Sequence, residues 1–175
     1  MNLLTLLLLP FTTHAFPYGR CYVPKCKHAP FQAFLTQEEP NKFCFQFQKK
    51  TCTNESYNCC DRFQNLTYKF VMPSLPVCNK SLDYVTINTL KKPSSVFFDI
   101  YGSKAELRLT ALNMKEPRFL NAEFCVYLKN NSACSTYESF CRLTRTNKKC
   151  SIALFDPSEH DCCPHCKVKK TLLPG

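Results

Sequence analysis

Apolar and polar residues alternate with a period of two along several stretches of the chain. In the clearest stretch, Phe43, Phe45 and Phe47 are separated by Cys44 and Gln46. The same alternation recurs over residues 66–70, 107–111 and 124–128. Because successive side chains of a strand point to opposite faces, each stretch predicts an antiparallel strand with one buried and one more polar face.

Shorter apolar runs over residues 84–87, 96–101 and 152–155 bring the expected number of strands to about seven, which suits a sandwich of two sheets. The chain contains 15 Phe and 8 Tyr but no Trp, a composition that fits an aromatic core between two sheets. We therefore expect an all-β fold, a disulfide-rich antiparallel β-sandwich-like domain with one short helix.

The expected helix begins near Ser135. Ser135 and Glu138 have the spacing of a capping box, in which each side chain accepts a hydrogen bond from the other residue's backbone amide. Cys134 and Cys141 bracket the segment, and about 10 Å of helix would separate them. One disulfide cannot span that distance. Each cysteine is therefore expected to bond elsewhere and to attach one end of the helix to the sheets.

The first fifteen residues have the features of a secretory signal peptide. An apolar run over residues 3–11 is followed by Thr13-His14-Ala15, with small residues where signal peptidase requires them. The run is too short to span a bilayer. We expect residues 1–15 to be the signal peptide, residues 16–166 to form one domain, and residues 167–175 to form a short basic C-terminal tail.

All 14 cysteines lie in the predicted mature chain, a density typical of oxidised extracellular scaffolds. We expect secretion and a disulfide at every one of these positions: Cys21, Cys26, Cys44, Cys52, Cys59, Cys60, Cys78, Cys125, Cys134, Cys141, Cys150, Cys162, Cys163 and Cys166. The pairing cannot be read from the sequence. Adjacent cysteines seldom bond each other, so the doublets at 59–60 and 162–163 are each expected to tie one strand to two different places.

Six short motifs follow one another in order along the mature chain. They are FPYGRC (16–21), FCF (43–45), CCDRFQNLTYKF (59–70), CVYL (125–128), CSTYESFC (134–141) and CSIALFDPSEHDCCP (150–164). Together they resemble the ordered cysteines, the two doublets and the CxxALF…CCP ending of the pherophorin domain of green-algal extracellular-matrix glycoproteins. The resemblance covers nearly the whole mature chain. It implies a structural role in assembling a cell wall or matrix, with no catalytic residues.

Several features depart from the family pattern. Gly19 stands where the family has a cysteine, while Cys26 and Cys166 are additional, which leaves room for a rewired set of bridges. The hydroxyproline-rich rod that often joins two such domains is absent from the sequence, which disfavours a long fibrous role. The net charge of +10 is also more than the resemblance implies.

The densest group of potential metal ligands lies near the end of the chain. It contains His160, Cys162, Cys163, His165 and Cys166. Imidazole and thiolate groups at these spacings can close a tetrahedral zinc site. In a secreted protein, however, oxidation consumes the thiolates. Disulfides are therefore the favoured interpretation, and we expect no metal and no other cofactor.

The sequence offers little support for catalysis. The mature chain has three histidines as candidate bases, and no serine lies in a GxSxG elbow. Carboxylates such as Asp156, Glu159 and Asp161 could form a glycosidase pair, but solvated loop charge is the favoured interpretation. We expect a protein that is not an enzyme.

The chain is strongly basic, with 23 Lys and Arg against 13 Asp and Glu. A secreted cationic protein meets acidic polysaccharides and acidic glycoproteins rather than nucleic acid. The best candidate for polyanion binding is the cation-only segment with Arg142, Arg145, Lys148 and Lys149, held between Cys141 and Cys150. We expect a secreted structural module of the extracellular matrix or cell wall that binds acidic polysaccharide or matrix glycoproteins. A secreted signalling or receptor-binding ligand is the alternative, and an extracellular hydrolase is a third interpretation.

Four N-x-Ser/Thr sequons, at Asn54, Asn65, Asn79 and Asn130, generate a testable prediction. In material secreted from eukaryotic cells, we expect the mature chain to begin at Phe16 and at least two sequons to carry glycans. Intact-mass measurement before and after treatment with an N-glycosidase checks both points. An unchanged mass would contradict the glycan prediction.

Overall fold

The computed structural model describes residues 21–54, 57–130, 132–141, 150–157 and 161–170. Its strands form two six-stranded mixed sheets. Sheet A contains, in spatial order, β1 (Val23–Lys25), β11 (Cys162–Lys167), β10 (Ser151–Phe155), β4 (Lys69–Ser74), β8 (Lys104–Leu109) and β7 (Val96–Tyr101). Sheet B contains β12 (Lys169–Lys170), β2 (Phe31–Glu39), β3 (Lys42–Lys49), β9 (Phe124–Leu128), β5 (Leu82–Ile87) and β6 (Leu90–Lys91).

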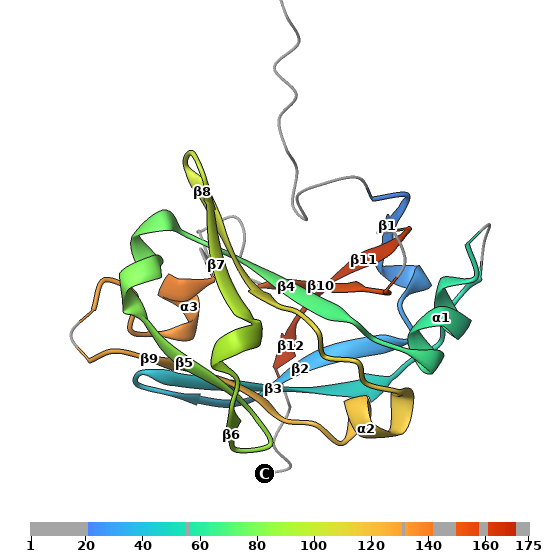
Figure 1. The fold of residues 1–175 in the computed structure, drawn as a ribbon, viewed down its shortest axis with the longest axis horizontal. Helices are drawn as coiled ribbons and strands as arrows, with labels where there is room; N and C mark the ends of the chain where they lie inside the picture. Colours follow the sequence, from blue (N-terminus) through green and yellow to red (C-terminus); the bar gives the residue numbers. More distant parts are fainter. Residues whose placement is uncertain (1–20, 55–56, 131, 142–149, 158–160, 171–175) are drawn as a thin grey trace, which may run out of the picture.

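Short helices lie at the two ends of this pair of sheets. In Figure 1, α1 (Cys59–Asn65) and α2 (Glu116–Leu120) lie at one end and α3 (Tyr137–Phe140) lies at the other. Three 3₁₀ helices connect the strands: η1 (Cys26–His28), η2 (Pro76–Ser81) and η3 (Pro93–Ser95). The expected all-β, disulfide-rich fold is confirmed. The expectation of a single helix is wrong, because α1 and α2 are too short to show a helical period in the sequence.

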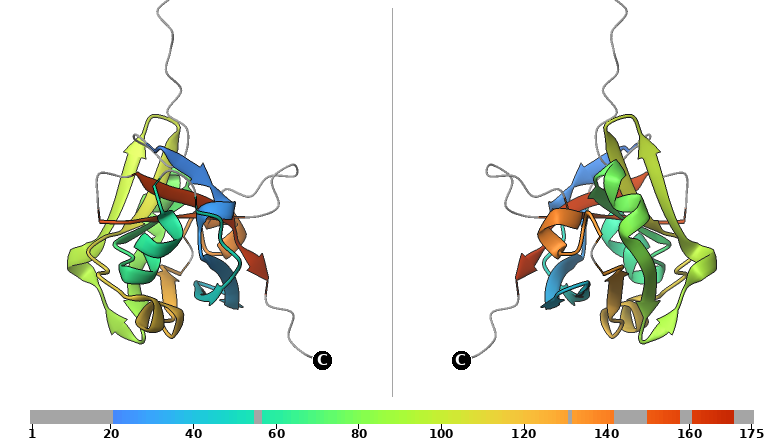
Figure 2. Two further views of the ribbon diagram at one scale, coloured as in Figure 1. Left: turned by 90° about the vertical axis from the view of Figure 1, so that its right-hand side faces the viewer. Right: turned by 90° about the vertical axis from the view of Figure 1, so that its left-hand side faces the viewer.

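The sheets pack face to face around the predicted aromatic core. Figures 1 and 2 show β3 and β9 in one layer and β4 and β10 in the other. Phe47 of β3 lies 5.5 Å from Phe124 of β9, and Phe70 of β4 lies 5.4 Å from the same ring, measured between ring centroids. Phe43, Phe45 and Phe47 are all buried, as their alternation predicts. Aromatic contacts therefore join both sheets at the centre of the domain.

The arrangement is mixed rather than purely antiparallel. β1 pairs in parallel with β11, and β12 pairs in parallel with β2. In each parallel pair, one strand comes from near the beginning of the described chain and the other comes from near its end. Residues 167–170, assigned to a basic tail by the sequence analysis, lie in or between β11 and β12 of these sheets.

Two of the predicted strands differ from the structure. The strand expected over residues 66–70 begins only at Lys69, because α1 continues to Asn65. The expected inner face is confirmed for Phe70, which is buried in the core, but Leu66 and Tyr68 precede the strand and are only partly covered. Thr67 and Lys69, expected on the more polar face, are buried. Similarly, β8 ends at Leu109, and Ala111 lies in the following loop, where it is exposed and has a positive φ of 52°.

The capping box lies one residue later than expected. Thr136, not Ser135, is the N-cap of α3: its Oγ1 accepts a hydrogen bond from the Ser139 amide at 3.2 Å, and Ser139 Oγ accepts from the Thr136 amide at 3.1 Å. The Ser135 carbonyl instead accepts from the Asn41 amide at 2.9 Å, which keeps Ser135 in a loop beside the β2–β3 turn. As expected, Cys134 and Cys141 bond outside the helix, to Cys78 and Cys150.

A buried acid–base network lies on the outer face of sheet A. Glu106 and Lys69 are 3% and 9% exposed, and Arg108 Nη2 lies 3.1 Å from Asp99 Oδ2 beside them. Burial raises the pKa of Glu106 to about 7, helped by the charge of Asp99 and opposed by Arg108 and Lys69. Burial also lowers the pKa of Lys69 to about 8, helped by repulsion from Arg108. Near neutral pH, Lys69 therefore carries a charge that its surroundings disfavour, and Glu106 begins to acquire one.

The raised pKa of Glu106 predicts a loss of stability as the pH rises from about 4.5 to about 7. Over this range the folded protein holds a proton that the unfolded chain has released, so we expect the free energy of unfolding to fall by about 1–3 kcal/mol. Denaturant titration at several pH values measures it. The Glu106→Gln variant should lose most of this dependence, while the exposed Glu39→Gln control should keep it. Parallel profiles for Glu106→Gln and the wild type would show that Glu106 does not control it.

Candidate functional site

The segment predicted to bind polyanions lies outside the described residues. Arg142, Arg145, Lys148 and Lys149 fall in the range 142–149, and the predicted signal peptide and His160 also fall outside. Polyanion binding by these four residues therefore stays a prediction. The described residues do place the cysteines, the sequons and the remaining candidate ligands.

The structure pairs all fourteen cysteines and leaves no free thiol. The seven bridges are Cys21–Cys163, Cys26–Cys166, Cys44–Cys125, Cys52–Cys60, Cys59–Cys162, Cys78–Cys134 and Cys141–Cys150. They are distributed over both sheets and over the helices at both ends of the domain. Strands β7 and β8 contain no cysteine and are held in sheet A by their pairing with each other and with β4.

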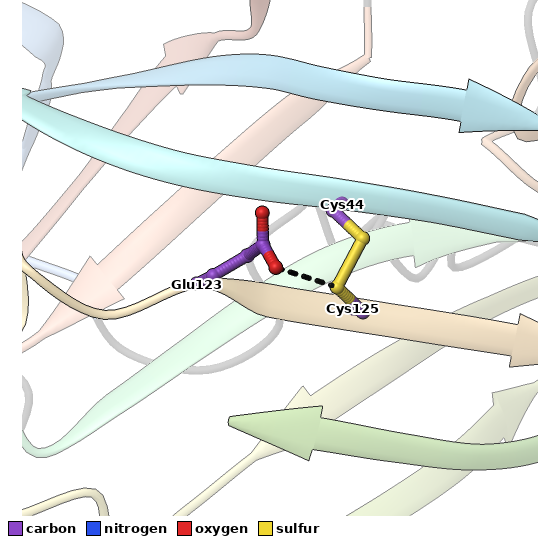
Figure 3. A group of neighbouring side chains, drawn as sticks. All are labelled: Cys44, Glu123 and Cys125. Atoms are coloured by element: carbon purple, nitrogen blue, oxygen red, sulfur yellow. Dashed lines mark hydrogen bonds between the residues drawn. A yellow bond between two sulfur atoms is a disulfide. The ribbon is translucent and has the colours of Figure 1, made fainter. Parts of the chain in front are cut away.

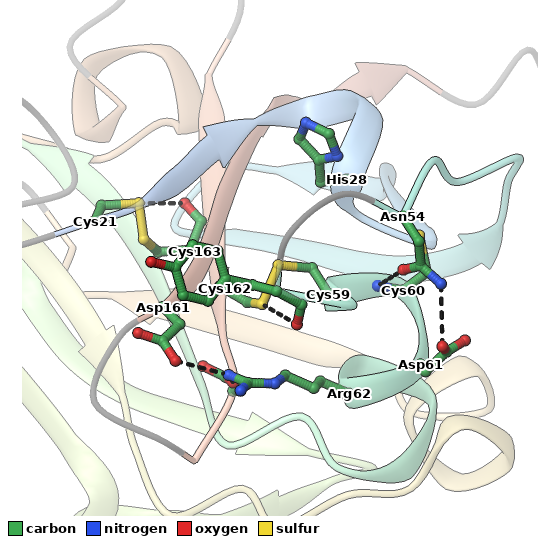
Figure 4. The surroundings of a disulfide bond; sticks show 12 residues. Cys21, His28, Asn54, Cys59, Cys60, Asp61, Arg62, Asp161, Cys162 and Cys163 are labelled. Atoms are coloured by element: carbon green, nitrogen blue, oxygen red, sulfur yellow. Dashed lines mark hydrogen bonds and ion pairs between the residues drawn. A yellow bond between two sulfur atoms is a disulfide. The ribbon is translucent and has the colours of Figure 1, made fainter.

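The two cysteine doublets meet in one place. Cys59 bonds Cys162, while the neighbours Cys60 and Cys163 bond Cys52 and Cys21 (Figure 4). Each doublet therefore connects to two different places, as expected. The first doublet lies at the start of α1 rather than on a strand, because residues 59–65 form a helix.

Two bridges close the beginning of the described chain onto its end. Cys21–Cys163 and Cys26–Cys166 flank the parallel pairing of β1 with β11. The two cysteines identified above as additional to the family pattern, Cys26 and Cys166, thus bond each other. The departure from the pattern adds one bridge of its own and does not take a partner from another cysteine.

The suspected zinc ligands belong to disulfides. Cys162, Cys163 and Cys166 bond three different partners, so their sulfurs are not thiolates. His165 lies in β11 and is partly buried, and burial lowers the pKa of its imidazole. The three cysteines of this group are therefore explained as disulfide partners and not as zinc ligands.

A second group with metal-ligand atoms, Cys44, Glu123 and Cys125, has the same explanation. The ligand atoms lie within 4.8 Å of one another, but Cys44 and Cys125 form a bridge between β3 and β9 (Figure 3). Glu123 Oε2 lies 3.6 Å from Cys125 Sγ, which carries no proton in a disulfide. This group therefore joins two strands and lacks the free thiolates that a zinc site requires.

Two of the carboxylates considered for a glycosidase pair bind one arginine instead. Arg62 Nη1 of α1 donates to Asp156 Oδ2 and to Asp161 Oδ2, each at 2.9 Å (Figure 4). The hydrogen bond to Asp161 and the contacts with Asp156 raise the pKa of the guanidinium. Asp156 is only 1% exposed, so this contact compensates a buried charge. The two carboxylates thus hold α1 against the β10–β11 connection.

All four sequon asparagines are exposed. Asn65 is the last residue of α1, not the start of a strand as expected, and Asn79 lies in η2. Asn54 Oδ1 accepts from the Cys60 amide and its Nδ2 donates to Asp61 Oδ2, both at 3.0 Å (Figure 4). Asn130 Oδ1 accepts from Asn41 Nδ2 at 2.7 Å, which leaves its own Nδ2 for a glycan. These positions are compatible with N-glycosylation, which stays a prediction.

The outer face of sheet B gathers basic and aromatic side chains that the sequence analysis did not single out. Lys42, Tyr84, Lys91 and Tyr127 lie side by side there, from four different strands. Alternation in the sequence indicates which face each residue occupies. Only the strand order and register of the folded sheet bring the four together.

None of the helices in the described part of the chain has the length and apolar character needed to cross a bilayer.

The fold and the seven bridges together define a disulfide-rich all-β domain of the class found in oxidising extracellular surroundings. A family model described as pherophorin matches residues 16–164, and the chain belongs to that family. No curated protein compared with the chain matches it. Pherophorins are structural matrix glycoproteins. The family membership and the seven disulfides of this chain therefore fit a secreted matrix-type module.

The bridges at the first doublet allow a matched comparison of stability. Cys59–Cys162 spans 103 residues of sequence and Cys52–Cys60 only 8. A bridge that closes a longer loop stabilises the fold more, although the other bridges reduce the effective length of the loop closed by Cys59–Cys162. We therefore expect the Cys59→Ala/Cys162→Ala variant to lose about 1–2 kcal/mol more unfolding free energy than Cys52→Ala/Cys60→Ala. Denaturant melts of both variants under non-reducing conditions measure the difference. Equal losses would mean that loop closure does not govern these two bridges.

Proposed function

We propose that this protein is a secreted structural module of an extracellular matrix or cell wall, and that it binds acidic polysaccharides or other matrix glycoproteins. The observation that carries the proposal is the family match over residues 16–164, because the family consists of structural matrix glycoproteins. Matrix assembly requires a stable domain that holds partners, without a chemical step.

The disulfide framework supports an extracellular role. Seven bridges restrain the unfolded chain and thereby stabilise the folded domain. Oxidising compartments form and preserve such bridges, whereas the cytosol reduces them. A matrix component must persist for long periods in that setting, and seven cross-links within one domain suit this demand.

The charge supports an acidic partner. The chain carries a net charge of +10. Four exposed lysines, Lys80, Lys115, Lys129 and Lys167, make no ion pair within the described part of the chain. These four lysines contribute only to the general attraction of polyanions, which acts over about one Debye length, roughly 8 Å at physiological salt, and they belong to no proposed binding site. Uronic-acid and sulfated polysaccharides have the complementary charge.

The proposed binding is tested first at the cation-only segment predicted from the sequence. We expect the mature protein to bind polygalacturonate or dextran sulfate at low salt, and binding to weaken steeply as salt rises. Replacing Arg142, Arg145, Lys148 and Lys149 by Ala should reduce the affinity about tenfold or more, since each exposed ion pair contributes about 0–1 kcal/mol. Isothermal titration calorimetry measures both effects.

The matched control for this experiment removes the same charge elsewhere, through Lys80→Ala, Lys115→Ala, Lys129→Ala and Lys167→Ala. If both variants weaken binding equally, only net charge matters and the segment is no site. If the wild type binds neither polymer at low salt, acidic polysaccharide is not its partner, and a matrix role would rest on contacts between proteins.

A further inference from the structure

One row of side chains on the outer face of sheet B combines tyrosines with lysines. The register pairs Lys42 of β3 with Tyr127 of β9, and Tyr127 with Tyr84 of β5. Each of the three has a sequence neighbour that is buried in the core: Phe43 follows Lys42, Val126 precedes Tyr127 and Val85 follows Tyr84. Because side chains alternate along a strand, all three members of the row point to the opposite, outer face.

The four residues form a continuous stack. The rings of Tyr84 and Tyr127 are stacked, with centroids 4.3 Å apart and planes inclined by 18°. Lys91 Nζ of β6 lies 3.9 Å from the Tyr84 centroid, and Lys42 Nζ lies 5.6 Å from the Tyr127 centroid. The strand order places one lysine beyond each tyrosine. We call Lys91, Tyr84, Tyr127 and Lys42, in this spatial order, the tyrosine–lysine row.

The stack determines which atoms the row offers to a ligand. Each ring is only partly exposed, with its faces toward the other ring and a lysine. A sugar therefore cannot lie flat on either ring. The polar tip of a tyrosine ordinarily stays in water, so the row presents two phenol hydroxyls flanked by two ammonium groups. These groups bind anions and hydroxyls.

The lysines of the row make no ion pair. Within the described residues, neither Lys42 nor Lys91 pairs with a carboxylate: Glu39, which lies opposite Lys42 in the register, accepts a hydrogen bond from Gln37 Nε2 instead. The exposed Asp83 next to Tyr84 makes no ion pair with either lysine. Glu123 of the same face lies four residues from Tyr127 along the chain, about 13 Å away in an extended strand. Sheet A differs, because its outer face pairs Arg108 with Asp99 and buries Lys69 near Glu106.

The scaffold holds the row in place before any ligand arrives. The Cys44–Cys125 bridge joins β3 and β9 (Figure 3). It lies on the same outer face, two residues from Lys42 and from Tyr127 along their strands. Its two cysteines are 0% and 4% exposed. The cations also pack against rings, which restricts their side chains. Groups that are already ordered lose less conformational entropy when they bind.

We propose that the tyrosine–lysine row is a binding site for a linear anionic polysaccharide. Lys42 and Lys91 would contact carboxylate or sulfate groups of the polymer, and the hydroxyls of Tyr84 and Tyr127 would hydrogen-bond the sugar between them. The occupant is an acidic polymer because two lysines that make no ion pair favour a negatively charged ligand, and because the covered ring faces exclude the stacking that neutral sugars use. This inference rests on the proposed function and assigns it a site that lies outside residues 142–149.

The experiment compares two variants of equal charge. Lys42→Ala/Lys91→Ala removes the cations of the row, and Lys80→Ala/Lys115→Ala removes two exposed lysines elsewhere. With polygalacturonate and dextran sulfate as probes at low salt, we expect the row variant to bind about fivefold to twentyfold more weakly than the wild type. The control variant should stay within about twofold. Neutral dextran should not bind to either protein.

The hydroxyls are tested separately. Tyr84→Phe/Tyr127→Phe keeps both rings and their stack but removes both hydrogen-bonding groups. We expect this variant to bind several-fold more weakly while keeping the salt dependence of the wild type, because no charge has changed. Unchanged thermal melts establish that each variant is folded.

The outcomes separate this inference from the proposed function. If the wild type binds the polymers, and the row variants bind as tightly as the control, the row is not the site although the function stands. If the wild type binds neither polymer, the proposed polysaccharide binding itself fails. Protection of Lys42 and Lys91 from reductive methylation by bound polymer, read by peptide mass spectrometry, would support the row directly; equal labelling of both lysines with and without polymer would argue against it.

Discussion

Covalent attachment of one strand to three distant parts of the chain organises this domain. Strand β11 carries Cys162, Cys163 and Cys166, which bond Cys59, Cys21 and Cys26. The last described strands are thereby fixed to the first strand and to the helix in between. β11 has few large apolar side chains of its own, so disulfides, more than hydrophobic contacts, keep it in sheet A. The edge pairing with β1, the position of α1 and the Arg62 contacts all follow from this attachment.

The two outer faces of the sandwich use charge in opposite ways. Sheet A places its acids and bases together, partly buried, so that their charges compensate each other at a cost in stability near neutral pH. In sheet B, Lys42, Lys91 and Lys169 lie against aromatic rings and make no ion pair in the described part of the chain, whereas Lys49 and Lys170 pair with Glu116 and Glu38. The aromatic core satisfies the packing needs of both sheets from the inside. The outer face of sheet B is the one on which we propose that an acidic partner binds.

The sequence predicts the strands whose alternation is complete, and much less of what depends on distant contacts. β3 and β9 were readable because Phe and Val occupy every second position. β2 escaped detection because a bulge between Leu35 and Gln37 breaks its period, and β11 because Pro164 and three cysteines hide its pattern. The family was readable from the order of the cysteines, but not their pairing. The tyrosine–lysine row was not readable at all, because its residues meet only through the register of four strands.

The closure of the chain onto itself also has a mechanical consequence. The segment between Cys26 and Cys166 contains about 140 residues, which would extend to roughly 450–500 Å if pulled straight. Tension applied at the two ends of the domain instead passes from β1 to β11 through Cys26–Cys166 and Cys21–Cys163. The hydrogen bonds of the sandwich lie outside this path and carry almost none of the force. A wall or matrix that swells and stretches can thus load such a domain without unfolding it, while its outer faces keep their shape.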